Sequence, residues 1–566
     1  MKKSIIKSSA GVALSSALLL SQIGTAQAFS FHKGELRGSF DTDVTYGISM
    51  RTEDADSDNF GAHGNRIFKD AGDVFSNSIR GSSTLSLEYG DYGMLARGNY
   101  FYDYAYDNED LADQAHDKLA RDLSLTDLMF YGYFGDNDQV NIRVGKQVIS
   151  WGENTFIQGS INDINTVDVN KLRQPGLALK DAFIGTNAAY VSWNIDDEWS
   201  IESFYLFEFD QVQLDPAGSY FTTLDAVGAG GGFDTAGDGV VGGVATGAAN
   251  LPFGAPSGAC ISPDQLDDCG LVGGSLVRVG DKFAEGGQYG LAIRKFFPEV
   301  FGGTELALYY QSLHDHTPMI STFYGTGQFF LEYVENIERI GMSFNTNISG
   351  WAIGGEYHVR KDAPIQMTGG VLSGLGAAGP FPAGLGLCGT CAVGDEVTGY
   401  DFVDRHQMQM TFQRIWGVGF MDADANSTLL EVAYGWVDDL PTKNEPIVGG
   451  AFRSVFNPQV TESFWGFQIK QSLTYEAALF NVASVSPFIA FKYDVEGVSN
   501  EIVPLFVDDR KALTIGANFG YGGGTWTGGV SWTMFDGGNG MLNQAGSRLN
   551  GRTDRDFIQA NISYSF

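Results

Sequence analysis

Apolar and polar residues alternate with a period of two in many parts of the chain. From Leu36 to Met50 every second residue is mostly apolar or small, whereas the residues between them, from Glu35 to Ser49, are mostly polar or charged. Such alternation predicts a β-strand with one face towards an apolar phase and the other towards water. The pattern recurs in 79–89 and 526–534. A soluble β-sandwich also alternates, so these segments establish strands but not their environment.

About 18 segments carry such a signal, and single-chain bacterial membrane barrels have an even number of strands. The predicted strands are 35–51, 78–89, 94–105, 123–134, 139–151, 187–195, 199–209, 287–297, 304–314, 337–346, 351–361, 405–416, 427–437, 462–476, 485–496, 509–521, 525–536 and 555–566.

The connections between these segments alternate in length. Short connections occur at 90–93, 135–138, 196–198, 347–350 and 522–524, while the long ones include 52–77, 152–186, 210–286 and 362–405. Short periplasmic turns and long extracellular loops are typical of outer-membrane proteins, and a soluble sandwich gives no reason for this order. The fold class predicted is all-β, a transmembrane antiparallel β-barrel of about 18 strands.

The C-terminal strand places its apolar residues on one face and ends on an aromatic residue. Ile558, Ile562, Tyr564 and Phe566 alternate with polar residues up to the last position. This ending resembles the terminal-aromatic signal by which outer-membrane barrels are recognised for assembly. We therefore expect outer-membrane lipid, lipopolysaccharide and the barrel assembly machinery as partners.

The first 28 residues have the features of a secretory signal peptide. Lys2, Lys3 and Lys7 precede a short apolar segment, 10–20, and the segment 26–28 (Ala-Gln-Ala) offers small residues to a signal peptidase. We expect cleavage after Ala28, leaving a single barrel domain, 29–566, in the outer membrane of a Gram-negative cell. No later stretch is long and apolar enough to predict a transmembrane helix.

Composition narrows the function classes. The chain of 566 residues has 35 Lys and Arg against 68 Asp and Glu, a formal net charge of -33. The negative electrostatic potential of such a chain repels phosphate backbones, so nucleic acid is not expected as a partner. Hydrophobic residues make up 43% of the chain, which is too many for a disordered protein.

A barrel of this circumference encloses a channel, so something must line or obstruct the lumen. The segment 151–183 is too rich in apolar residues for a flexible, solvent-exposed surface loop. We interpret it as an inward-folded loop, with a loop that caps the rim as the alternative. Arg173 would be available to a carboxylate on the cargo or to Glu153, and Pro175 should keep Gln174 extended. The candidate ligand-binding residues are Trp151, Glu153, Phe156, Arg173, Leu177 and Phe183.

Four cysteines lie in two Gly-rich segments. Cys260 and Cys269 are close in sequence, as are Cys388 and Cys391. Four cysteines permit three pairings, and local disulfides 260–269 and 388–391 are favoured in an oxidising compartment. A redox Cys-x-x-Cys is the alternative, but its usual helix N-terminus is missing.

No cofactor, metal or catalytic residue is predicted. Asp54, Asp56 and Asp58 imitate the start of a calcium loop but lack its glycine and its terminal Glu. His314 and His316 have no third ligand in view. With seven His and no Gly-x-Ser-x-Gly motif, the chain is not expected to be an enzyme.

Several longer motifs resemble one known family. The segments 31–41 (FHKGELRGSFD), 64–78 (GNRIFKDAGDVFSNS), 143–180 and 214–225 (LDPAGSYFTTLD) together look like the proteobacterial domain-of-unknown-function family thirteen-oh-two. The resemblance implies an outer-membrane barrel, often encoded beside a periplasmic lipoprotein-like partner and an RND-class exporter, near genes for using lipids, terpenes, steroids or alkanes. The family has no agreed catalytic residues to carry over.

Three functions are consistent with these observations. The leading hypothesis is a conduit for uptake or export of hydrophobic compounds, possessing an apolar path or a lateral opening. The alternative is a diffusion porin for small polar solutes, which should line its constriction with facing charges. The third is a structural or adhesive barrel that presents its long loops.

Overall fold

We describe the chain from a computed structural model. The structure describes residues 29–56, 67–177, 179–223, 227–231, 277–324, 326, 328–367, 391–441, 444–447, 451–454, 460–538 and 549–566. The predicted signal peptide, 1–28, lies outside these residues, so its cleavage stays a prediction.

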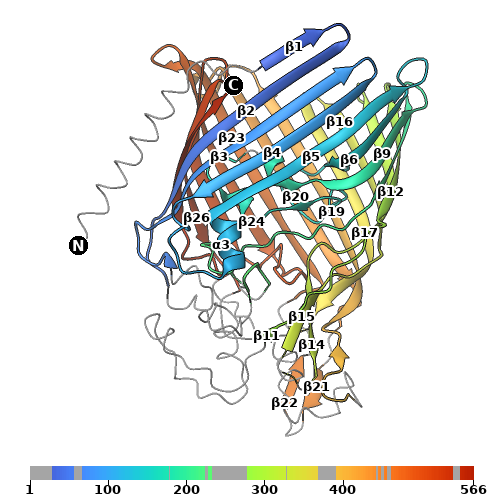
Figure 1. Cartoon of the computed structure of the whole chain (residues 1–566), viewed down its shortest axis with the longest axis vertical. Coiled ribbons are helices and arrows are strands. Elements are labelled where there is room, and N and C mark those ends of the chain that lie inside the picture. Colours follow the sequence, from blue (N-terminus) through green and yellow to red (C-terminus); the bar gives the residue numbers. More distant parts are fainter. Residues whose placement is uncertain are drawn as a thin grey trace.

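The chain forms a closed antiparallel β-barrel of 18 strands, as the sequence predicts (Figure 1). Every strand pairs with the next barrel strand along the chain, and β27 pairs with β2 to close the ring. The barrel strands are β2 (Leu36–Arg51), β3 (Val74–Tyr89), β4 (Tyr92–Asp103), β5 (Arg121–Phe134), β6 (Val140–Gln147), β9 (Thr186–Asn194), β10 (Trp199–Leu206), β12 (Tyr289–Phe297), β13 (Thr304–Leu313), β16 (Ile337–Ile348), β17 (Trp351–Gln366), β19 (Tyr400–Trp416), β20 (Ala425–Asp438), β23 (Ser463–Leu479), β24 (Ala483–Glu496), β25 (Lys511–Tyr521), β26 (Trp526–Asp536) and β27 (Phe557–Ser565).

The remaining elements are short. Strand β1 extends the sheet beside the start of β2, and β11, β14, β15 and β18 form a small sheet that projects from the end of the barrel with the long connections (Figure 1). Their bounds are β1 (Phe29–Lys33), α3 (Asp113–Ala120), β7 (Thr166–Val167), η2 (Lys171–Arg173), η3 (Leu179–Asp181), β8 (Phe183–Ile184), β11 (Val277–Arg278), β14 (Met319–Phe323), β15 (Gln328–Glu332), β18 (Glu396–Val397), η6 (Phe420–Asp422), β21 (Asn444–Ile447) and β22 (Ala451–Ser454).

The register of β2 follows the alternation in its sequence. Thr45 in β2 hydrogen-bonds Ser563 in β27, with 2.7 Å between the hydroxyl oxygens, and both side chains lie on the inner face. Met50 of β2 and Ile562 of β27 lie on the outer face, where their side chains are 36% and 44% exposed. The predicted inner and outer faces of the first and last strands are therefore confirmed.

The outer wall exposes an apolar band, as a surface against lipid requires. Aromatic side chains gather beside the short turns, which is typical of the boundary between hydrocarbon and water. The band includes Leu125, Phe130, Val144, Val191, Leu291, Leu306, Leu308, Ile340, Met342, Met410, Ile489, Ile515, Val530 and Trp532, and the aromatic residues include Tyr89, Tyr92, Phe134, Trp193, Trp199, Trp416 and Tyr521. No helix in the described part of the chain is long and apolar enough to cross a membrane.

The predicted order of short and long connections holds, but several bounds were wrong. Strand β6 ends at Gln147 rather than at 151, because the chain turns into the lumen there. Strand β17 continues to Gln366, past a register shift between Arg360 and Ala363. A β-bulge inserts residues without ending the pairing, so the charged segment there does not mark the end of the strand.

Candidate functional site in the barrel lumen

The connection between β6 and β9, residues 148–185, folds into the lumen, and we call it the inner segment. Its backbone is fixed by two carboxylates of the barrel wall, Glu356 in β17 and Glu431 in β20. Glu356 in β17 accepts hydrogen bonds from the backbone N–H of Glu153 at 2.8 Å and of Ile161 at 3.1 Å. Carboxylate bonds to backbone N–H groups are among the strong hydrogen bonds in proteins. The loop interpretation, rather than the rim cap, is therefore confirmed.

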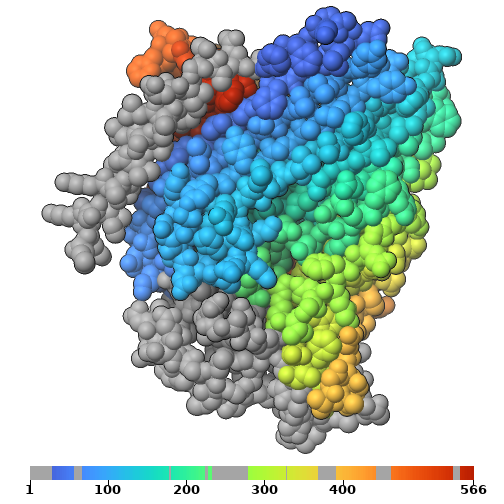
Figure 2. All heavy atoms as spheres, viewed as in Figure 1, coloured from blue at the N-terminus to red at the C-terminus, as the bar shows by residue number. Residues whose placement is uncertain are grey.

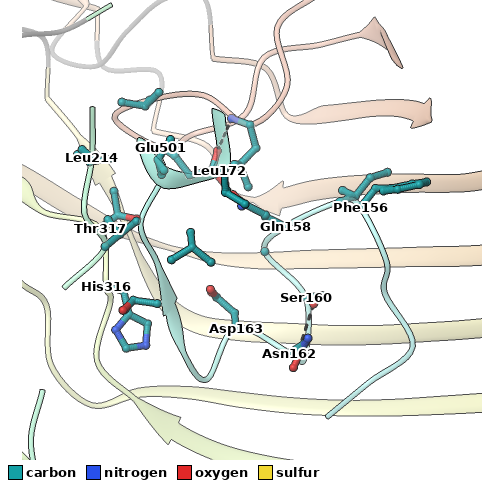
Figure 3. A pocket seen from close by; sticks show the side chains of 18 of the residues that line it. Phe156, Gln158, Ser160, Asn162, Asp163, Leu172, Leu214, His316, Thr317 and Glu501 are labelled. Atoms are coloured by element: carbon teal, nitrogen blue, oxygen red, sulfur yellow. Dashed lines mark hydrogen bonds between the residues drawn. The ribbon is translucent and has the colours of Figure 1, made fainter. Parts of the chain in front are cut away.

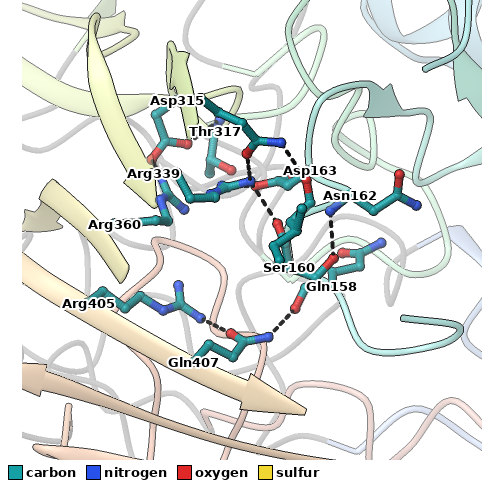
Figure 4. A network of polar contacts seen from close by, with 12 residues as sticks. Gln158, Ser160, Asn162, Asp163, Asp315, Thr317, Arg339, Arg360, Arg405 and Gln407 are labelled. Atoms are coloured by element: carbon teal, nitrogen blue, oxygen red, sulfur yellow. Dashed lines mark hydrogen bonds and ion pairs between the residues drawn. The ribbon is translucent and has the colours of Figure 1, made fainter. Parts of the chain in front are cut away.

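A polar network joins the inner segment to strands β16 and β19 (Figure 4). Arg339 in β16 donates to the Ser160 carbonyl at 2.7 Å and forms an ion pair with Asp163 at 3.0 Å. Gln407 in β19 donates to the Gln158 carbonyl at 3.1 Å. These side chains satisfy backbone carbonyls that no strand partner reaches, which keeps an irregular segment stable inside the barrel.

An apolar cluster attaches the start of the inner segment to the wall formed by β9, β10, β12 and β13. Trp151 is 1% exposed and packs against Phe204 and Tyr309, with ring centroids 4.8 Å and 5.7 Å away. Its indole N–H donates to Glu202 at 2.6 Å. The remaining members of the cluster are Ile149, Ile161, Ile164, Ala188, Tyr190, Leu206, Ala292, Ala307 and Leu313.

The far end of the inner segment reaches other strands. Lys171 forms an ion pair with Asp122 in β5 at 2.6 Å. Pro175 lies against Gly47 in β2 so closely that an added Cβ at Gly47 would sit 2.5 Å from the proline ring. Gln174 has φ -69° and ψ 139°, the extended conformation predicted from Pro175. The inner segment therefore crosses the lumen between two parts of the wall and narrows it.

A cavity of about 870 Å³ remains beside the inner segment. Figure 3 shows Phe156, Leu172 and Leu214 around it together with the polar Gln158 and Glu501. Its lining mixes apolar side chains with charged ones, and pockets of this size and composition are typical of sites for small organic molecules.

Most cations in the cavity wall are matched by a carboxylate. Examples are Arg360 with Asp315 at 2.7 Å and Arg97 with Asp127 at 3.1 Å, and Arg405 also forms an ion pair with Glu501. A partly buried charge is less costly when it is paired with an opposite charge than when it is unpaired.

The pKa values of carboxyls on the connections reflect these pairs. Burial by itself would raise the pKa of Asp163, but the positive charges of Arg339 and Arg360 outweigh it and hold that pKa below its ordinary value. Burial would likewise raise the pKa of Glu501, but the positive charge of Arg405 outweighs burial and lowers that pKa. Glu153 forms no ion pair with any residue that the structure describes, and burial raises its pKa despite the positive charge of Arg294. Two of the three carboxyls therefore depend on their charged form for their contacts.

The structure divides the six candidate residues into two groups. Phe156, Arg173 and Phe183 line the cavity. The expectation that Trp151 and Glu153 belong to the same surface was wrong, because Trp151 is packed in the wall and Glu153 accepts a hydrogen bond from Asn345 at 3.1 Å.

The remaining two details concern Arg173 and Leu177. Arg173 pairs with Asp215, at 2.5 Å, rather than with Glu153. Leu177 lies half-buried on the inner segment, outside the cavity lining. A binding role for these six residues stays a prediction.

Sequence reasoning missed the wall residues that hold the inner segment. Glu356 and Glu431 could have been noticed as carboxylates at inward positions of their strands. A second signal is the apolar inner face of β9 to β13, where Ala188, Ala292 and Ala307 are almost completely buried. Small apolar residues on both faces of a strand indicate that the lumen is filled at that level.

The structure tests only part of what the sequence predicts about disulfides and metals. Cys391 is disulfide-bonded, whereas Cys260, Cys269 and Cys388 lie outside the described residues, so both pairings stay predictions. Among the residues that the structure describes, no group of three or more His, Cys, Asp or Glu could hold a metal ion.

A family model described as a protein of unknown function (DUF1302) matches residues 9–566. No curated protein matches the sequence.

Solved structures with a similar fold are outer-membrane proteins and porins at very low identity. OpdK from Pseudomonas aeruginosa is 8% identical with a TM-score of 0.42, covering 94% of this chain and 98% of that chain. OccAB4 from Acinetobacter baumannii is 9% identical with a TM-score of 0.43 and the same coverage. A BenF-like porin from Pseudomonas fluorescens Pf-5 is 9% identical with a TM-score of 0.42, again covering 94% and 98%. Because these identities and TM-scores are low, no function is inferred from them.

Proposed function

Because this chain belongs to the DUF1302 family of unknown function, we propose from its own geometry that it is a transport channel of the Gram-negative outer membrane for hydrophobic and amphipathic compounds. The observation that carries the proposal is the inner segment, which crosses the lumen and leaves a cavity of about 870 Å³ with both apolar and charged walls. A purely structural barrel has no need of a shaped cavity at its centre.

The route that the geometry supports runs along the lumen. Each of the 18 barrel strands is hydrogen-bonded to both neighbours, and the face shown in Figure 2 is an unbroken wall. Opening a lateral path between strands would break several backbone hydrogen bonds in an apolar medium, at several kcal/mol each. Cargo therefore passes the inner segment and meets Phe156, Leu172 and Phe183 on the way.

Replacing the inner segment tests the proposal. Gln147 and Thr186 are direct partners at the ends of β6 and β9, so a turn of roughly four residues can join these strands as a hairpin. We expect this variant to fold, shown by heat-modifiable mobility, yet to lose uptake or export of a hydrophobic compound such as an alkane or sterol. The same turn sequence substituted for 418–423, at the other end of the barrel, is the control and should leave transport intact.

A diffusion porin for polar solutes is the second candidate, because ion pairs such as Arg339 with Asp163 face the lumen. For a porin, the hairpin variant should show a large gain in single-channel conductance and wider solute uptake, with handling of hydrophobic compounds unchanged. That combination would replace the first proposal by the second.

The partners expected from the family resemblance also stay proposals. A periplasmic lipoprotein-like carrier and an RND-class exporter would meet the channel at the end with the short turns, which is the periplasmic end in this orientation. Crosslinking from positions in the turn 417–424 to co-expressed candidates tests this, and the long-loop end serves as the control.

A further inference from the structure

One corner of the cavity carries more positive than negative charge. Arg173, Lys492, Arg510 and Arg552 all line the cavity there. Arg173 pairs with Asp215 at 2.5 Å. Arg510 and Lys492 share Asp494, at 2.6 Å and 3.6 Å. Four cations thus meet two carboxylates, in a chain whose net charge is -33.

Arg552 is the cation without a protein partner. Its side chain is half-buried in the cavity wall, and no hydrogen bond or ion pair joins its guanidinium to any part of the chain that the structure describes. Burial, together with the positive charges of Arg173 and Arg510, lowers the pKa of Arg552 well below its ordinary value, although the negative charge of Asp215 opposes this. Five N–H donors on an unmatched cation are a costly arrangement unless a ligand supplies an anion.

Apolar side chains next to this corner indicate which kind of molecule could carry the anion. The ring of Phe221 lies under the Arg173 guanidinium, 4.8 Å from its carbon to the ring centroid. Leu172 and Leu214 face the same cavity (Figure 3). A ligand with an anionic head and an apolar body would satisfy both kinds of wall at once.

We infer that Arg552 is the centre of a subsite for the carboxylate of an amphipathic organic cargo, whose apolar body lies along Leu172 and Leu214. This inference rests on the proposed function, because it names the class of compound that the channel carries. Arg173 and Arg510 contribute positive potential while their own partners hold them in position, and a planar guanidinium fits a carboxylate with two parallel hydrogen bonds.

Binding is measured separately from transport, by equilibrium dialysis of labelled octanoate against the whole barrel in lipid nanodiscs, with empty nanodiscs subtracted. We expect octanoate to bind at least about tenfold more tightly than octanol or acetate, since octanol lacks the charge and acetate lacks the apolar body. Equal binding of octanol would show a merely apolar cavity, equal binding of acetate would show a general anion site, and either result would overturn the inference.

Substitutions locate the subsite. Arg552→Gln should weaken octanoate binding by about tenfold or more, whereas Arg552→Lys, which keeps the positive charge but loses the two parallel hydrogen bonds, should weaken it less. The control is Arg121→Gln, because the Arg121 side chain is 65% exposed and remote from the cavity lining. Heat-modifiable mobility verifies folding of each variant. Unchanged octanoate affinity in folded Arg552→Gln would overturn the subsite while the transport proposal stands, whereas failure of the hairpin variant to alter transport would overturn the function alone.

Discussion

The carboxylate of Glu431 in β20 accepts a hydrogen bond from the Phe156 backbone N–H at 2.6 Å, although 275 residues separate the two in sequence. The same carboxylate accepts from Thr155 at 2.7 Å and from Ile157 at 2.8 Å. Three successive N–H groups around one charged group form an anchor that fixes the part of the inner segment bearing Phe156, a cavity-lining residue.

Removal of this anchor should loosen the inner segment without unfolding the barrel. In Glu431→Ala three N–H groups lose their acceptor, and the loss at the buried Ile157 alone costs about 1–3 kcal/mol. We expect noisier and larger single-channel currents at unchanged heat-modifiable mobility. Glu476→Ala, at an exposed position of β23, is the matched control, and identical currents in the two variants would contradict the anchoring role.

Gly47 should be required for docking of the far end of the inner segment. A Cβ at this position would lie 2.5 Å from the Pro175 ring, which is rigid and cannot move aside alone. Overpacking of this kind costs about 1–3 kcal/mol. Gly47→Ala should therefore raise conductance, whereas Gly417→Ala, at a turn glycine with no atom within 4 Å of its Cβ position, should not.

The lipid-facing register can be tested within one strand. Val530 lies near the middle of β26 and is 43% exposed on the outer face, while Thr527 lies on the inner face of the same strand. Val530→Arg should lose about 2–4 kcal/mol of folding free energy, the penalty for Arg near the bilayer midplane. Thr527→Arg should assemble normally, and equal loss of the heat-modifiable band in both variants would disprove the register.

Acid should release the inner segment through Asp163 and Glu501. The folded-state pKa of each is lowered by Arg339 or Arg405, so their stabilisation is complete above about pH 4, the ordinary carboxyl value, and is lost as pH falls through the lower folded-state value. We expect conductance to change below about pH 4. The double variant Asp163→Asn, Glu501→Gln should already show the altered conductance at neutral pH, and persistence of the same acid transition there would contradict this assignment.

The sequence by itself determined the barrel. Alternation along a strand is a local property of the sequence, because successive residues face lipid and water in turn. The number and order of the strands, and the faces of β2 and β27, could therefore be predicted without tertiary information. Strand ends were less well defined. The bulge after Arg360 let β17 continue through residues that resemble a loop.

The tertiary structure alone decided what the inner segment contacts. Alternation shows that Glu356, Glu431 and Arg339 face inward, but not which distant backbone group each will meet, because those contacts join residues far apart in sequence. For the same reason Arg173 found Asp215 instead of Glu153. The excess charge around Arg552 likewise exists only because the closed barrel brings four separate connections and strands to one corner of its lumen.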